Sequence, residues 1–178
     1  MPLPIAHCLV GASVVVASRK GFLWREDWWP LLVGAVMAVS PDFDLFLVWV
    51  LGYDIRIHGG FTHSIVFAIP LGMLGALLVR EFNQRGLMIY IAVALSHGFL
   101  DFAMKKDFGG AQLFWPFSPH RFTLGLFNYY EFYPTPGVEP LGEILKQALN
   151  VTYYEVMIFA PLFIVVLLWR QWQQRRAL

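Results

Sequence analysis

A histidine and an aspartate stand four residues apart near the end of an apolar run over residues 87–103. They are His97 and Asp101, in the stretch SHGFLD at residues 96–101. On a helix this spacing places both side chains on one face, one turn apart. An imidazole and a carboxylate so arranged can hold one metal ion, or can hydrogen bond to each other. Ionisable groups in a membrane segment are costly and are usually functional.

Five more histidines and aspartates are candidate partners of this pair. Mixed imidazole and carboxylate ligands suit zinc, manganese or iron, and such ions activate water and polarise phosphoryl or carbonyl oxygens. Taken singly, each candidate has a structural alternative: a buried and satisfied histidine, a solvated loop residue, or a counter-ion for Arg56. The candidates are His7, Asp42, Asp44, His58 and His63.

Composition places the chain among integral membrane proteins. Its 178 residues fit one domain, residues 1–178, and 58% of them are hydrophobic while only 14% are charged. The mean hydropathy of +0.58 is too high for an ordinary soluble fold. A net charge of +1 gives no basic stripe for nucleic acid. A single cysteine excludes an internal disulfide and a CxxC metal site.

Five apolar segments predict an all-α polytopic membrane bundle of about five helices. They cover residues 4–18, 28–51, 64–79, 87–103 and 153–169. The first is short for a span, so an interfacial or re-entrant placement stays open. Pro41 interrupts the second, because proline removes a backbone hydrogen bond inside a helix.

Residues 104–150 are predicted to form one long outer loop at the membrane interface. Apolar residues recur at helical spacing from Leu141 to Leu149, with Glu143 and Lys146 between them. This pattern predicts that the loop carries an amphipathic helix lying on the membrane or on the protein.

The lysines and arginines set the expected orientation. If five spans alternate sides, eight of the 13 basic residues lie on one side and five on the other. The positive-inside rule then puts the N-terminus outside and the C-terminus in the cytoplasm, although Lys105 and Lys106 locally oppose this. Every histidine and all seven candidate ligands then fall on the outer side.

Several motifs together resemble one known family over residues 7–122. They are His7 with Gly11, Pro41-Asp42-Phe43-Asp44, HGGFTHS at residues 58–64, SHGFLD at residues 96–101, and Trp115-Pro116-Phe117-Ser118 with Arg121-Phe122. The combination is similar to the YdjM-like, LexA-regulated, membrane-bound, predicted metal-dependent hydrolases of bacteria. One departure is Gly59-Gly60, where that family's pattern leads us to expect a basic residue.

The resemblance implies a metal-dependent hydrolase of the bacterial inner membrane. The implied ligands are His7, Asp42, Asp44, His58, His63, His97 and Asp101. The order of these residues is also similar to the zinc-dependent phospholipase C and P1 nuclease group, which cleaves phosphoesters with clustered zinc ions. A second helical motif bearing a glutamate is missing here, which argues against a full three-metal site.

We therefore expect one to three divalent ions, zinc first and manganese or iron as alternatives. The expected substrate is a phosphoester in a membrane lipid or a lipid-linked molecule. Whichever of Asp42, Asp44 and Asp101 is not a ligand is expected to act as general base, and Arg121 with Ser118 to hold the anion.

Two competing functions stay open, and two enzyme classes are disfavoured. The chain could be a non-enzymatic protein that binds or conducts a metal ion, or a structural protein whose polar groups make packing hydrogen bonds. No HExxH motif supports peptide cleavage, and no GxSxG motif supports a serine hydrolase.

Overall fold

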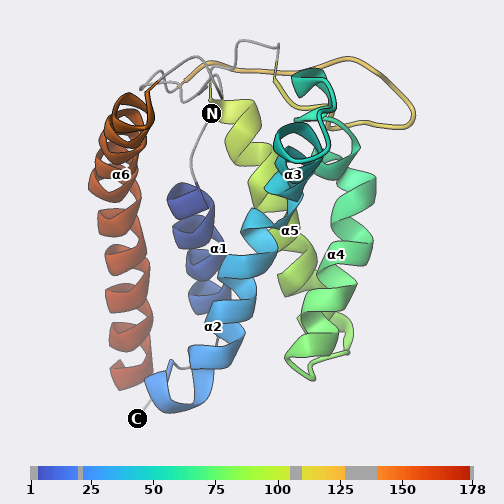
Figure 1. Cartoon of the computed structure of the whole chain (residues 1–178). Helices are drawn as coiled ribbons and strands as arrows, with labels where there is room; N and C mark the ends of the chain where they lie inside the picture. The colour runs from blue at the N-terminus through green and yellow to red at the C-terminus, as the bar shows by residue number, and fades with distance from the viewer. Residues whose placement is uncertain (1–3, 20–21, 105–109, 127–139, 177–178) are drawn as a thin grey trace.

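The chain folds into an up-and-down bundle of helices (Figure 1). The computed structural model describes residues 4–19, 22–104, 110–126 and 140–176. Its long helices are α1 (Pro4–Ser18), α2 (Trp24–Val39), α4 (Ile65–Leu78), α5 (Gln84–Ala103) and α6 (Leu141–Arg176). In these ranges no strand forms, and strand-like geometry is limited to isolated bridges such as the one between Ala111 and Phe122. The predicted all-α membrane fold is confirmed.

The helices differ in their capacity to cross a membrane. Among the described residues, three stretches are long and apolar enough to span: Trp24–Trp49, Gln84–Ala103 and Leu141–Arg176. The pair Ile55–His63 and Ile65–Leu78, bent by 65°, is a fourth candidate, and α1 is a shorter apolar helix. All five predicted segments are therefore helical, but three of them make full-length spans.

The last helix corrects one prediction. The amphipathic stretch at residues 141–149 is helical, as expected, but it is not a separate helix within an outer loop. It forms the first turns of α6, which continues without a break to Arg176. With 36 residues α6 is about 54 Å long, well over the thickness of a bilayer core.

The break predicted at Pro41 is confirmed and shapes the upper end of the bundle. Helix α2 ends at Val39, a 3-10 turn η1 covers Ser40–Phe43, and α3 covers Asp44–Trp49. Because Pro41 has no N–H, it cannot donate to the carbonyls of the preceding turn. Asp42 and Asp44 are buried, whereas Phe43 between them is 67% exposed.

Helix α1 holds the bundle together through close contacts. It packs against α2, α5 and α6, while α4 packs mainly on α5. Where α1 crosses α2, a Cβ on Gly11 would come within 2.5 Å of Ala38 Cβ and 2.7 Å of Gly34 O. Small residues at such crossings let membrane helices approach closely.

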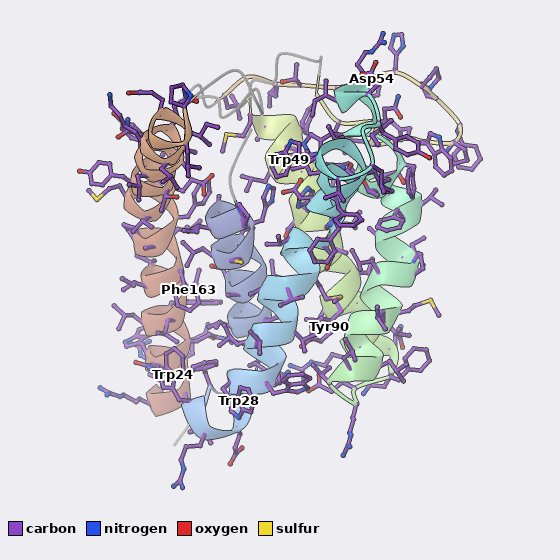
Figure 2. The ribbon with its side chains drawn as sticks, in the orientation of Figure 1. Trp24, Trp28, Trp49, Asp54, Tyr90 and Phe163 are labelled. Atoms are coloured by element: carbon purple, nitrogen blue, oxygen red, sulfur yellow. The ribbon has the colours of Figure 1, made fainter. Side chains whose placement is uncertain are left out.

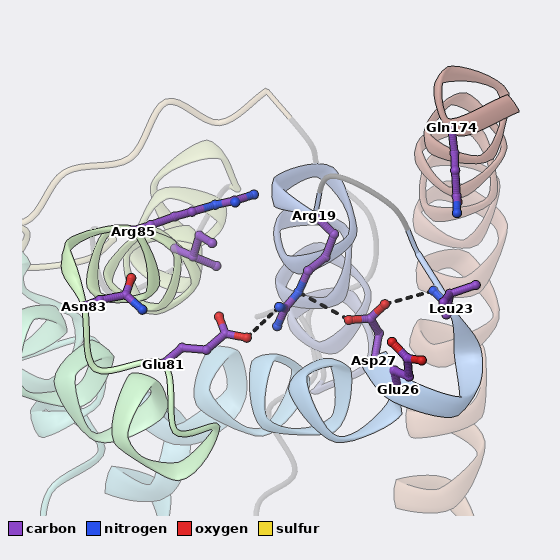
Figure 3. A pocket seen from close by; sticks show the side chains of 9 residues that line it. Arg19, Leu23, Glu26, Asp27, Glu81, Asn83, Arg85 and Gln174 are labelled. Atoms are coloured by element: carbon purple, nitrogen blue, oxygen red, sulfur yellow. Dashed lines mark hydrogen bonds and ion pairs between the residues drawn. The ribbon is translucent and has the colours of Figure 1, made fainter. Parts of the chain in front are cut away.

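Charged residues gather at the lower end of the bundle, where α1 ends and α2 begins (Figure 3). Arg19 forms ion pairs with Glu81 at 2.5 Å and with Asp27 at 3.5 Å. These contacts join α1, α2 and the α4–α5 turn around a cavity of about 420 Å³. Trp24 and Trp28, which are about half exposed, lie near this end of the bundle. Trp49, also half exposed, lies at the opposite end (Figure 2).

We expect Gly11→Ala to destabilise the bundle by about 1–3 kcal/mol, because the added methyl overpacks the α1–α2 crossing. The measurement is the free energy of unfolding in mixed detergent micelles. Gly142→Ala is the matched control, since a Cβ at Gly142 meets nothing within 4 Å. Equal stability of the two variants would contradict the close contact at Gly11.

Candidate metal site

All seven predicted ligand residues are buried, and their side chains gather at one end of the bundle. They come from four separate parts of the chain: His7 from α1, Asp42 and Asp44 from the broken span, His58 and His63 from the short turns that follow, and His97 with Asp101 from α5. The 3-10 turns η2 (Ile55–Ile57) and η3 (Phe61–His63) carry the two central histidines into the bundle. The structure thus brings the seven candidates together at one end of the bundle, and the side of the membrane on which this end lies stays a prediction.

Four of these side chains form the tightest group. Ligand atoms of Asp42, His63, His97 and Asp101 all lie within 4.8 Å of one another. His63 Nε2 is 3.0 Å from Asp101 Oδ2 and 3.5 Å from Asp42 Oδ1. His97 Nε2 is 3.3 Å from Asp42 Oδ1 and 3.7 Å from Asp101 Oδ2. The helical pair His97 and Asp101 therefore shares its site with residues from two other elements.

The tautomer of His97 follows from its other nitrogen. His97 Nδ1 lies 2.7 Å from Ala38 O, which can only accept, so Nδ1 carries the hydrogen. In the neutral ring Nε2 then has a lone pair, and it faces two carboxylates. Among the described residues, neither His97 Nε2 nor Asp42 Oδ2 has a hydrogen-bond partner, although both atoms are buried. A cation between them satisfies both, so the donor set fits a metal ion.

His63 is oriented in the same way. Thr62 Oγ1 donates its one hydrogen to Asp44 Oδ2 at 2.8 Å, so it accepts from His63 Nδ1 at 2.9 Å. The lone pair of a neutral His63 therefore lies on Nε2, the atom that faces Asp42 and Asp101. Its backbone also lies against α5, since a Cβ on Gly98 would come within 2.7 Å of His63 O.

A second group contains Asp44, His58 and His63. Here His58 Nδ1 lies 2.8 Å from Asp44 Oδ1 and donates to it. The two oxygens of Asp44 thus accept from His58 and from Thr62, which makes Asp44 an orienting carboxylate behind two histidines. His58 Nε2 is left facing Asp42 Oδ1 at 3.9 Å. The geometry therefore directs three imidazoles at the same carboxylate of Asp42.

His7 stands at the edge of this cluster. Its ring stacks on His97 with 3.9 Å between centroids, and its Nε2 lies 3.6 Å from Asp101 Oδ1. It belongs to neither of the two groups of ligand atoms. Asp101 therefore faces His63 and His97 through Oδ2 and His7 through Oδ1.

Comparison with known proteins shows the family of the chain. Residues 1–177 match the family described as YdjM inner membrane protein. The chain belongs to this family. The inner membrane protein YbcI of Escherichia coli strain K12 is 34% identical over 98 residues, which are 52% of this chain and 56% of YbcI. The alignment thus spans little more than half of that relative, and no solved structure matches the chain.

The family match bears out the resemblance drawn from the motifs and extends it beyond residues 7–122 to nearly the whole chain. The YdjM family and YbcI are both described as inner membrane proteins, and the three long apolar helices agree with that location. Neither description assigns a reaction, a metal or an orientation. The predicted positions of the two termini stay predictions.

Arg121 holds the loop that carries His58. Its Nη1 donates to His58 O at 2.9 Å and to Gly110 O at 3.1 Å, and its Nη2 donates to Arg56 O. A Cβ on Gly59 would come within 3.0 Å of Arg121 Nη1, so a guanidinium lies beside the first glycine. Burial lowers the pKa of Arg121, and the charge of Asp44 opposes this shift.

The remaining serines and the fifth histidine lie outside the cluster. Ser118 Oγ accepts from the backbone of His120, which is exposed. Ser64 and Ser96 both donate to backbone carbonyls, of Phe61 and Val93. These bonds explain the serines as local structure. The catalytic roles predicted for the aspartates, Arg121 and Ser118 stay predictions.

Sequence reasoning missed Glu155, a fully buried carboxylate on α6. Its Oε2 accepts from Ala6 N at 3.1 Å, in the first turn of α1 and next to His7. A carboxylate is favourable there because the first N–H groups of a helix have no partner within it. The signal in the sequence was a lone acid at the start of an apolar span.

We expect His97→Ala to lose bound zinc and Asp44→Asn to bind zinc about 10–100-fold more weakly, the usual effect of removing an orienting group. The measurement is metal content and zinc affinity of this YdjM family protein purified in detergent. His120→Ala is the matched control and keeps its metal. Wild-type metal content in His97→Ala would exclude the site, and equal losses in both variants would make Asp44 a ligand.

Glu155→Ala is expected to destabilise the docking of α6 on α1 by about 1–3 kcal/mol, because it leaves a buried N–H without an acceptor. Glu155→Gln keeps an acceptor oxygen and is expected to recover most of that loss. The measurement is the free energy of unfolding in micelles. If Glu155→Ala were as stable as the wild type, the hydrogen bond from Ala6 N to Glu155 would not contribute to the free energy of unfolding.

Proposed function

We propose that this protein is a metal-dependent hydrolase that cleaves a phosphoester in a membrane lipid or lipid-linked molecule. One observation carries the proposal. Three imidazoles, from His58, His63 and His97, have their Nδ1 atoms committed to other partners, and their Nε2 atoms approach Asp42 Oδ1 at 3.9, 3.5 and 3.3 Å. Such convergence of neutral nitrogen donors on a carboxylate is typical of a divalent metal centre.

The residues that would hold the ion are His58, His63, His97, Asp42 and Asp101, with zinc first and manganese or iron as alternatives. When bound, the metal supplies a Lewis acid that polarises a phosphoryl oxygen and acidifies water. Asp44 and Thr62 keep His58 and His63 in the required tautomers, and Ala38 O does so for His97. The side chains of the cluster are buried, and the low dielectric around them strengthens each electrostatic interaction.

The proton released by the attacking water needs an acceptor, and the Asp101–His7 pair is the best placed. Asp101 Oδ1 faces His7 Nε2 at 3.6 Å, away from the other imidazoles. His7 lies outside both groups of ligand atoms, and its Nε2 faces Asp101, so we assign proton transfer to this histidine. Arg121, near Asp44 and the His58 turn, keeps that turn in place and adds positive charge for an anionic substrate.

Hydrolysis is favoured over metal transport because an apolar core separates the two ends of the bundle. Between the cluster and the charged residues around Arg19 lies an apolar core that includes Val15, Val33 and Val93. Polar side chains are sparse there: in the part of the chain that the structure describes, Ser13 and Tyr90 are buried at this depth, and they donate to the backbone carbonyls of Leu9 and Pro30. A conducting path needs polar groups along its length.

The location proposed for the reaction is the outer face of the inner membrane. It is supported by the excess of lysine and arginine expected on the opposite side, together with the gathering of the cluster at one end of the bundle. Lipid head groups on that side are the phosphoesters within reach of a site at the end of the helices.

We expect the zinc-loaded protein to hydrolyse bis(p-nitrophenyl) phosphate, and His7→Gln to lower kcat by about 10²–10⁴-fold while keeping its zinc. His97→Ala is expected to lose both zinc and activity, and His120→Ala to keep both. The measurements are kcat and metal content on the same samples. If the wild type binds zinc, manganese or iron but hydrolyses neither this diester nor a panel of phospholipids, a metal-binding role without catalysis replaces the proposal.

A further inference from the structure

A groove runs along the outside of the bundle between the broken span and α4. It has a volume of about 440 Å³, within the range of small-molecule binding sites. One wall runs along the broken span and includes Val36 on α2, Ser40 in η1 and Leu47 on α3. The other wall is Phe67, Leu71 and Leu74 on α4, at helical spacing. Both walls are mainly apolar.

The groove ends at the metal cluster. Asp44 and Thr62 line it together with the apolar residues, and they are hydrogen bonded to each other at 2.8 Å. Asp44 in turn holds His58, whose other nitrogen faces Asp42. The groove is therefore an apolar channel with one polar end, and that end is the orienting carboxylate of the cluster.

The groove is open on the side that a membrane surrounds. Val36 is 44% exposed, Leu74 45% and Phe43 67%, and all three line it. The broken span Trp24–Trp49 and the pair containing α4 are both candidate membrane spans. The surroundings of these residues are then lipid hydrocarbon, so the groove is entered from the bilayer and not from water.

We propose that this groove binds a hydrocarbon chain of the lipid substrate and places its phosphoester at the cluster. The placement of the phosphoester at the cluster rests on the function proposed above, whereas the binding of the hydrocarbon chain in the groove does not. An apolar chain gains free energy in the groove by dispersion contacts with both walls, and the polar end fixes which end of the lipid enters. The substrate class is therefore a phosphoester with at least one long chain, taken up sideways from the membrane.

The chain offers a matched control in a second groove. That groove, of about 470 Å³, lies along α5 beside Val10, Ala92 and Phe99, and it also faces outward. None of its lining residues belongs to either group of ligand atoms among the described residues. It is equally apolar but does not lead to the cluster, so a lipid in it gains no polar anchor.

The test compares binding of two phosphatidylglycerols with the same head group, one with dioleoyl and one with dihexanoyl chains. Native mass spectrometry of the full chain in detergent counts bound lipid without any need for turnover. Val36→Trp and Leu74→Trp fill the groove from opposite walls at exposed positions, and Ala92→Trp fills the second groove. Zinc content and thermal unfolding show that each variant is folded.

We expect the wild type and Ala92→Trp to bind dioleoyl phosphatidylglycerol alike. Val36→Trp and Leu74→Trp are each expected to bind this lipid about tenfold more weakly, because the loss of a few methylene contacts has an effect of this order. Dihexanoyl phosphatidylglycerol is expected to bind weakly to all four proteins. Equal dioleoyl binding by all four, or an equal loss in Ala92→Trp, would overturn the groove proposal. Hydrolysis of the same lipids by the wild type tests the catalytic proposal separately, because chain binding persists if catalysis is absent.

Discussion

Two carboxylates, Asp42 and Asp101, are buried among imidazoles inside an apolar bundle, and the rest of the structure is arranged around that constraint. Isolated carboxylates at such depth are very unfavourable unless they are paired or bind a metal. In the neutral histidines His58, His63 and His97, the Nδ1 hydrogens are engaged with other partners, so the Nε2 atoms present lone pairs to these carboxylates. The buried groups could hold a metal ion, and a divalent cation there would balance this charge.

The groups that hydrogen bond to the histidines and orient them come from a helix break and a 3-10 turn. Proline at position 41 stops the hydrogen-bond pattern of α2, and Ala38 O one turn earlier accepts from His97. Thr62, in a 3-10 turn, bridges Asp44 and His63. Irregular backbone at membrane depth is tolerated where protein covers it, and here it creates the orienting groups.

The same break in the span connects the cluster to the bilayer. A continuous helix in place of η1 and α3 would not present Asp44 at the end of an apolar groove. Because the turn places Asp42 and Asp44 inward and leaves Phe43 outward, one short segment serves both the metal cluster and the lipid-facing wall. Binding of a lipid chain and hydrolysis at its head group would thus depend on the same few residues.

Hydropathy and helical spacing are local properties, so they were enough to predict the membrane class, the helices, the break at Pro41 and the seven candidate ligands. The sequence by itself also sufficed for the resemblance to the YdjM family. Only the tertiary structure distinguished the roles within the cluster. Which nitrogen of His63 is a donor depends on Thr62 and Asp44. Ala6, the residue before His7, is held by Glu155, which lies 149 residues further along the chain. Such contacts join segments far apart in the chain, and no periodicity in the sequence encodes them. The pair His97 and Asp101 could be found from its spacing, but its other partners could be identified only from the packing of α1, the broken span and the turns before α4.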